Sequence, residues 1–295
     1  MRGAHPERAL HDAIEKGGVV RSGERIVVAC SGGPDSVALA GALAALAPAL
    51  DLQLTLAYVN HGTRASAWQD ECVVLRVGAT FGLPVRTVSL AGDAFDEASL
   101  RDARYTALLA IAREAGATAI ATAHHAEDQS ETVLLALFRG TGPTGLGGMQ
   151  ARRTLADGVD LIRPLLLQPA EGLRAYCHAE ALPYAVDPTN ADFELRRNAV
   201  RQALTGLRPL FPGLDEAIAR ASDLTAHEGA ETGRAGLRRQ VRAAVEADCG
   251  LKDVAFAHVE AAVVALERGG SGRFFMKDGV DLIIEAGRLR VDTHE

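Results

Sequence analysis

One short segment of the chain reads Ser31-Gly32-Gly33-Pro34-Asp35-Ser36. It lies between an apolar run, residues 25–30, and an alanine- and leucine-rich run, residues 37–46. This order predicts a strand, a tight glycine turn and a helix, with Pro34 at the first helical position. The free N–H groups and the positive end of such a helix attract a phosphate. Ser31 and Ser36 can add hydroxyl donors, and Asp35 can reach a magnesium ion on the phosphates.

The composition of the 295-residue chain is that of an ordinary globular protein, with 48% hydrophobic and 23% charged residues. No apolar run approaches the length of a membrane span, and polar residues interrupt the first eight positions, so we expect a cytoplasmic protein with no membrane partner. The four cysteines form no C-x-x-C pair, which leaves an iron–sulfur or structural zinc site without support. The net charge of −7 argues mildly against a nucleic-acid partner, but residues 196–208 hold four arginines and no carboxylate.

Strand and helix patterns alternate over the first two hundred residues. We expect strands over residues 25–30, 53–59, 84–90 and 117–122, and helices over residues 37–46, 67–80, 97–115 and 126–139. This alternation predicts an α/β fold with a doubly wound parallel sheet, covered on both faces. Ligands of such sheets bind at the carboxyl ends of the strands. Ser31, Asn60, His61 and His124 all follow strand ends and are therefore expected to share one cleft.

The alternation ends after residue 139. Five glycines in residues 140–148 exclude a regular helix or a strand interior there, leaving a flexible connector or a mobile loop over the site. A domain boundary is predicted at residues 209–213, which read Pro-Leu-Phe-Pro-Gly. We therefore expect a catalytic domain over residues 1–212 and a smaller, mainly helical domain over residues 213–295 that ends in a hairpin.

A second polar block lies at a predicted strand-to-helix junction, residues 123–135. Asp128, Glu131 and Thr132 are three to four residues apart and therefore share one helical face. Carboxylates near a helix N-terminus are stabilised by its dipole. Two histidines and three acids are more polar groups than stabilisation of a helix N-terminus requires. The block is therefore suited to hold Mg²⁺ on a triphosphate or to bind a cationic substrate.

A third block contains Arg197 and Arg201, one turn apart on a predicted helix. A solvated basic face is one interpretation of such a pair. The neighbouring Asn198 and the absence of carboxylates from residues 196–208 favour contact with phosphate.

These motifs together resemble the tRNA(Ile)-lysidine synthetase family of the PP-loop ATP pyrophosphatase superfamily, which has a HUP-like fold. The resemblance is carried by residues 31–36, 59–64, 101–105, 123–135, 139–142, 162–165 and 187–201. Two positions depart from the family pattern. The family usually has aspartate at the position of Asn60 and often has aspartate at the position of Glu127. Longer members carry a further C-terminal domain, so the chain is similar to the short form.

The resemblance implies a ligase that uses ATP and Mg²⁺ to make lysidine in tRNA. The O2 atom of the wobble cytidine of the isoleucine tRNA with a CAU anticodon attacks the α-phosphate of ATP, and pyrophosphate leaves. The ε-amine of free L-lysine then attacks C2 of the cytidine, and AMP leaves. The domain over residues 213–295 is expected to bind tRNA, and a homodimer is an open alternative for the oligomeric state.

The resemblance also implies roles for individual residues. The expected catalytic residues are Asp35, Asp128, Glu131 and Arg104. Those expected to bind ATP are Ser31, Gly32, Gly33, Pro34, Asp35, Ser36, Asn60, His61 and His125. Those expected to bind lysine or tRNA are Asp128, Glu131, Arg139, Arg197, Asn198 and Arg201. Asp35 and Asp128 are the expected ligands of Mg²⁺.

Two other functions stay open. A PP-loop enzyme of the tRNA thiolase type needs a reactive cysteine or a cluster, whereas Cys30 lies within a predicted strand and has no paired cysteine. A non-catalytic ATP-binding sensor would share the sheet but would not need Asp128, Glu131 or the arginine pair. Release of pyrophosphate on mixing with ATP, lysine and tRNA distinguishes the three.

Overall fold

The computed structural model divides into two compact units, Met1–Thr132 with Met149–Arg220, and Val133–Gly148 with Ala221–Glu295. Helices α5 (Ala126–Phe138) and α9 (Leu214–Glu228) run from the first unit into the second. The functional boundary expected at residue 212 stays a prediction. The structure describes residues 6–60, 67–90, 97–156, 158–185, 195–228, 234–250, 254, 256–277, 279–285 and 288–294.

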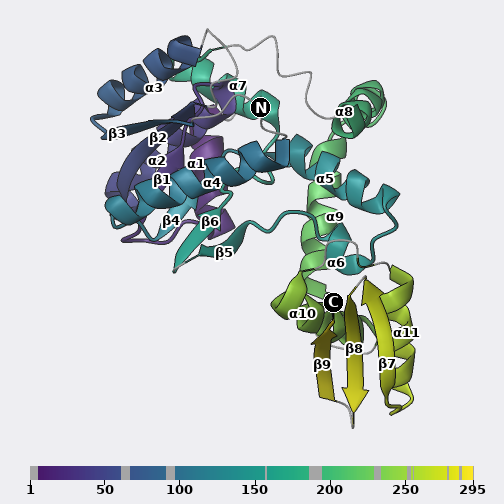
Figure 1. Cartoon of the computed structure of the whole chain (residues 1–295). Coiled ribbons are helices and arrows are strands. Elements are labelled where there is room, and N and C mark those ends of the chain that lie inside the picture. Colours follow the sequence, from purple (N-terminus) through teal and green to yellow (C-terminus); the bar gives the residue numbers. More distant parts are fainter. Residues whose placement is uncertain are drawn as a thin grey trace. The chain divides into compact units, whose positions relative to one another are not determined.

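The first unit contains a six-stranded sheet in the order β3-β2-β1-β4-β6-β5 (Figure 1). Its strands are β1 (Arg25–Ala29), β2 (Gln53–Asn60), β3 (Val85–Ser89), β4 (Ala119–Ala121), β5 (Arg152–Ala156) and β6 (Val159–Ile162). All neighbouring pairs are parallel except β5 and β6, which form an antiparallel hairpin at one edge. The predicted α/β class is confirmed, and this edge hairpin is an addition that the sequence patterns did not indicate.

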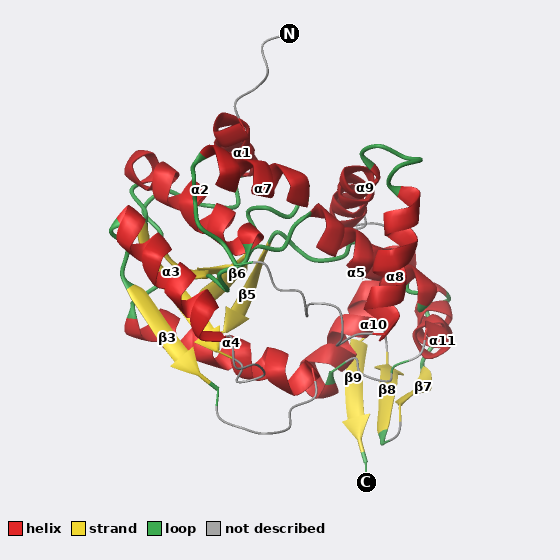
Figure 2. Cartoon of the chain, turned by 90° about the horizontal axis from the view of Figure 1, so that it is seen from above, coloured by secondary structure: helices red, strands yellow, loops and turns green. Residues whose placement is uncertain are grey.

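Helices cover both faces of this sheet (Figure 2). One face carries α1 (Pro6–Gly17), α2 (Pro34–Leu50), α3 (Ala67–Phe81) and α7 (Ala170–Ala179), and the other carries α4 (Glu97–Glu114). Ile26 and Val28 of β1 belong to the core under α2, whereas Val27 and Ala29 belong to the core under α4. A strand buried on both faces must be apolar throughout, which explains the continuous run that predicted it.

The first unit also contains α8 (Leu195–Leu207), and the second contains α10 (Arg234–Cys249) and α11 (Phe256–Glu267). These two helices of the second unit pack on an antiparallel sheet of β7 (Gly272–Lys277), β8 (Val280–Glu285) and β9 (Arg288–Thr293). The mainly helical C-terminal region with a final hairpin is confirmed, and its hairpin extends to three strands. No helix in the described ranges combines the length and the hydropathy needed to cross a bilayer.

The glycine-rich stretch contains one short helical element, α6 (Pro143–Leu146), which is about one turn long and so shorter than the regular helix that its glycines exclude. The hydroxyl of Thr141 donates to the carbonyl of Ala136 at 3.0 Å, and the amide of Leu146 donates to the carbonyl of Gly142 at 3.2 Å. A single turn needs only such isolated bonds, and glycine interrupts long helices more than it prevents one turn.

Candidate active site

The glycine turn joins β1 to α2 as the sequence predicts. Gly32 has φ +86°, and a Cβ atom there would lie 3.0 Å from the carbonyl oxygen of Asp70. Both the conformation and the close approach therefore require glycine. Gly33 is the N-cap of α2 and Pro34 opens the helix, so the first N–H groups of α2 lack intrahelical partners. The amide of Ala185 donates to the carbonyl of Gly32 at 2.9 Å and fixes the turn from the far side.

The hydroxyl of Ser36 is used inside the turn. Its Oγ accepts from the amide of Ser31 at 3.1 Å and donates to the carbonyl of Gly33 at 2.9 Å. Ser36 is buried, whereas Ser31 is exposed. The two hydroxyls are also hydrogen-bonded to each other at 3.2 Å. Ser36 therefore shapes the turn from inside, and Ser31 is the serine of the turn that solvent can reach.

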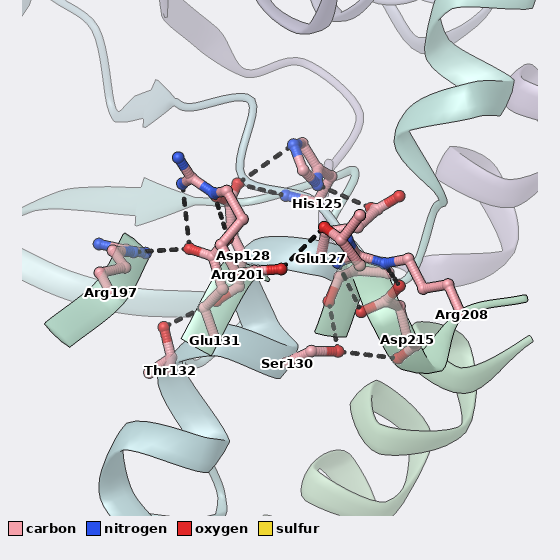
Figure 3. A network of polar contacts seen from close by, with 12 residues as sticks. His125, Glu127, Asp128, Ser130, Glu131, Thr132, Arg197, Arg201, Arg208 and Asp215 are labelled. Atoms are coloured by element: carbon pink, nitrogen blue, oxygen red, sulfur yellow. Dashed lines mark hydrogen bonds and ion pairs between the residues drawn. The ribbon is translucent and has the colours of Figure 1, made fainter. Parts of the chain in front are cut away.

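His125 lies among three carboxylates (Figure 3). Its Nδ1 is 2.9 Å from Glu127 Oε2, and its Nε2 is 3.6 Å from Asp35 Oδ2 and 3.5 Å from Asp128 Oδ2. Burial alone would lower the pKa of His125, but the neighbouring carboxylates of Asp35, Glu127 and Asp128 outweigh burial and raise the pKa to about 10. His125 is therefore an imidazolium at neutral pH, and it connects the acid of the glycine turn to those of α5.

Glu127 also determines where α7 begins. The amide of Ala170 donates to both carboxylate oxygens of Glu127 at 3.0 Å. This amide belongs to the first residue of α7, whose N-cap position is held by Pro169, a residue with no capping side chain. A carboxylate from α5 thus satisfies a donor that the helix leaves unpaired.

The donor set fits a magnesium ion that is shared with a nucleotide. Asp35 Oδ1 is buried, and no described residue forms a hydrogen bond with it. Burial raises the pKa of Asp128, against the attraction of His125. Mg²⁺ commonly binds one or two carboxylates, with substrate phosphates and water as its other ligands. Among the residues that the structure describes, no group of three or more His, Cys, Asp or Glu side chains forms a metal cage. Asp35 and Asp128 therefore suit a site that phosphates complete.

Glu131 holds α8 through two arginines (Figure 3). Arg197 Nε donates to Oε2 at 2.8 Å, while Arg201 donates from Nε to Oε1 at 2.7 Å and from Nη2 to Oε2 at 3.2 Å. The Glu131 side chain is only 3% exposed. Farther along the same window, Arg208 pairs with Asp215 at 2.6 Å. The basic window over residues 196–208 is therefore largely neutralised by carboxylates that lie outside it in the sequence.

The other predicted site residues are placed as follows. Asn60 is the last residue of β2, beside β1, and Arg104 is half-buried on α4. Asn198 is half-buried on α8. Arg139 directly follows α5 and belongs to the second unit. His61 lies outside the described residues.

Gln129 is a site-supporting residue that the sequence analysis missed. It is 1% exposed, its Nε2 donates to the carbonyl of Met149 at 3.1 Å, and the amide of Met149 donates to its Oε1 at 2.9 Å. This pair of bonds fixes the point where the chain returns to the first unit. A buried amide needs hydrogen-bond partners, so the position of Gln129 within the polar block was the available signal.

The protonated His125 predicts a pH dependence of stability. Its pKa is raised in the folded protein, so its contribution is complete below pH 6.5 and is lost as the pH rises towards about 10. In EDTA-containing buffer without ATP, we expect the free energy of unfolding to fall across this window, with a slope of at most about 1.4 kcal/mol per pH unit. Urea unfolding of the parent and of His125→Gln measures it, and an equally steep slope in the variant would contradict this assignment.

The glycine turn at the N-terminus of α2 and the carboxyl end of a parallel sheet define a phosphate-binding α/β protein of the PP-loop class. Residues 4–207 match the family model of the PP-loop domain. A curated tRNA(Ile)-lysidine synthase from Salinispora arenicola is 37% identical over 302 aligned positions that cover 90% of each chain. The chain belongs to the tRNA(Ile)-lysidine synthase family, which confirms the resemblance seen in its motifs.

Two further relatives with the same name are longer than the segment they share with this chain. That from Methylobacterium nodulans is 44% identical over 186 residues, which cover 62% of this chain and 54% of the relative. That from Ralstonia nicotianae is 42% identical over 204 residues, which cover 67% of this chain and 44% of the relative. The chain thus spans about half the length of these two relatives.

A solved structure supports the fold. The U34-tRNA thiolase NcsA from Methanococcus maripaludis is similar to this chain with a TM-score of 0.65 at 17% sequence identity, covering 75% of this chain and 79% of that chain. At this identity the similarity concerns the fold alone.

Proposed function

We propose that this chain ligates free L-lysine to C2 of the wobble cytidine of the isoleucine tRNA with a CAU anticodon, at the expense of ATP. The observation that carries the proposal is the His125 bridge, which joins Asp35 of the phosphate turn to Asp128 of α5. An acidic group suited to an amine therefore lies beside a turn suited to pyrophosphate. The names of the relatives supply the nature of the RNA.

In the first step, the cytidine O2 attacks the α-phosphate, and pyrophosphate leaves into the turn. The N–H groups of the turn and the dipole of α2 stabilise the charge of the leaving group. Asp35 and Asp128 would hold Mg²⁺, which neutralises phosphate charge when bound. Arg104 on α4 and Arg139 are proposed to stabilise charge that develops on the reacting phosphate.

In the second step, the ε-amine of lysine attacks C2, AMP leaves, and the amine loses a proton. Asp128 is proposed to attract the amine and to take this proton, because its raised pKa suits a carboxylate that accepts one. Arg197 is proposed to bind the lysine carboxylate. Glu131 already accepts three hydrogen bonds from Arg197 and Arg201, so we propose that its main contribution is to position them.

Asp128→Asn is expected to raise the KM for lysine about tenfold or more, because a hydrogen bond to a charged group contributes about 1.5–3 kcal/mol. Its affinity for tRNA is expected to stay within twofold of the parent. Steady-state kinetics in lysine and a tRNA binding titration, run side by side, measure the two effects. Asp12→Asn on α1 is the matched control. Asp12 is exposed, and this substitution removes one negative charge, as Asp128→Asn does. An unchanged KM with collapsed tRNA binding would place Asp128 on the RNA surface.

The proposed reaction is tested by mixing the chain with ATP, Mg²⁺, L-lysine and a transcript of the isoleucine tRNA that carries the CAU anticodon. Pyrophosphate release and nucleoside mass spectrometry are followed, with each component omitted in turn. Lysidine that forms only in the complete mixture supports the proposal. Turnover that needs a sulfur donor in place of lysine would indicate a thiolase, and ATP binding without turnover would indicate a sensor.

Three further statements belong to the same proposal. We propose that residues 213–295 contribute to tRNA binding, that the protein works in the cytoplasm, and that a homodimer is one alternative for its assembly. Gel filtration with light scattering tests the last of these directly.

A further inference from the structure

A second group of cationic side chains lies at the carboxyl ends of β4 and β6. These strands are parallel neighbours, and the amide of Thr122 donates to the carbonyl of Ile162 at 3.0 Å. His124 follows β4 and Arg163 follows β6. Adjacent parallel strands bring the residues after their ends to the same edge of the sheet.

Arg163 is the buried member of this group. It is only 3% exposed, and its Nη1 donates to the carbonyl of Gln150 at 2.7 Å. Its Nε is buried and has no hydrogen-bond partner among the residues that the structure describes. A buried charge without an anionic partner is costly, and none of the carboxylates that the structure describes forms an ion pair with this guanidinium, so it is suited to bind an anion.

Two arginines on α4 add to the positive charge. The guanidinium of Arg101 lies 5.9 Å from the ring centroid of Tyr105, and Arg104 is one turn further along the helix. Within the described ranges, no carboxylate forms an ion pair with Arg101, Arg104 or Arg163.

Electrostatic interactions between these groups shift their pKa values. Burial lowers the pKa of Arg163, the neighbouring Tyr105 hydroxyl opposes this shift, and the charges of Arg153 and Arg101 add to it. Burial, and then the charges of Arg163 and Arg104, hold the pKa of His124 well below its usual value. The nitrogen Nδ1 of His124 is bonded to the Thr122 hydroxyl at 2.9 Å. The histidine is therefore neutral, and among the described residues of this region several guanidinium groups have no carboxylate paired with them.

We propose that Arg101 and Arg163 bind a backbone phosphate of the RNA substrate, next to Arg104 at the reacting phosphate. This inference rests on the proposed function. In the sheet order β6 lies two strands from β1, or about 10 Å at the usual strand spacing. In ATP, the α-phosphate is bonded directly to the pyrophosphate that we place in the turn after β1. A phosphate at the end of β6 would lie farther away than this bond allows, so it is better supplied by the RNA backbone. Arginine pairs bidentately with phosphate, which fits a fork with an unused Nε–H.

The test compares Arg163→Gln, Arg163→Lys and Arg101→Gln with Arg174→Gln as the matched control. Arg174 is exposed on α7 of the same unit, and Arg174→Gln removes one positive charge, as the other Gln variants do. The affinity of the full chain for tRNA is measured across a series of salt concentrations, and its affinity for ATP is measured separately. We expect Arg163→Gln and Arg101→Gln each to weaken tRNA binding about five- to tenfold at low salt. Because both arginines act on one phosphate, the two substitutions together should reduce the salt slope by no more than about 0.7–0.9. Arg163→Lys should recover part of the affinity, and ATP binding should stay within twofold.

Three results would overturn the inference. A loss of ATP affinity without loss of tRNA affinity would assign these arginines to the nucleotide. Unchanged binding of both ligands would show that they contact no substrate phosphate, as would an equal loss in Arg174→Gln. Arg101 is exposed, so Arg101→Gln carries the test if Arg163→Gln fails to fold. A parent chain that binds tRNA with the expected slope but forms no lysidine contradicts the proposed reaction alone.

Discussion

Asp35→Ala is expected to reduce pyrophosphate release at least about 100-fold, the scale of losing one group that stabilises transition-state charge. The free energy of unfolding should change by no more than about 1 kcal/mol, as at other partly exposed positions. Asp35 lies in the first turn of α2, its side chain is 33% exposed, and its Oδ1 has no hydrogen-bond partner within the described part of the chain. His125 keeps Glu127 and Asp128 as anionic neighbours in the variant, so the fold should persist.

Pyrophosphate release and urea unfolding of the same preparations measure these two effects. Asp12→Ala on α1 serves as the control, because Asp12 is exposed and far along the chain from the turn. A variant that unfolds like the parent and still releases pyrophosphate at the parent rate would remove Asp35 from the reaction. A variant that loses several kcal/mol of stability would show that its carboxylate supports the fold.

Glu131→Gln is expected to destabilise the chain by about 2–3 kcal/mol. Removing one partner of a buried ion pair costs about 3–5 kcal/mol, and the expected value is lower because Arg197 and Arg201 are 23% and 42% exposed. The amide cannot supply the two negative oxygens that both arginines use. Proteolysis within residues 195–207 should therefore accelerate, since α8 loses its main polar attachment to α5.

Urea unfolding and limited proteolysis of Glu131→Gln, Arg201→Gln and the double variant measure this attachment. The double variant should lose less stability than the sum of the single variants, because the two side chains share one interaction. Arg196→Gln is the control, since Arg196 is exposed on the same helix. Unchanged stability with a raised KM for lysine would instead indicate that Glu131 contacts the amino acid directly.

The local features of the fold could be predicted from the sequence, and the pairings between distant segments could not. The glycine turn and the fully apolar β1 have signatures within a few residues, so both were found. Strand β5 carries no comparable apolar run, since it lies at an edge and pairs only with β6. The family resemblance identified the acids and arginines of the site, but the ion pair between Glu131 and Arg197 spans 66 residues. No periodic pattern encodes such a partner, so the arginines were interpreted as a face open to phosphate.

The hydrogen bond from the Ala170 amide to Glu127 limits which substitutions, insertions and deletions the two segments can accept in evolution. The first residue of α7 and the second residue of α5 are 43 positions apart, yet one carboxylate fixes their separation. A shorter side chain at 127 would no longer reach the amide unless the connection before α7 also changed. Insertions or deletions over residues 163–169 should therefore be accepted only together with a substitution at 127. Substitutions in these two segments should therefore be coupled in evolution, although the segments are far apart in the sequence.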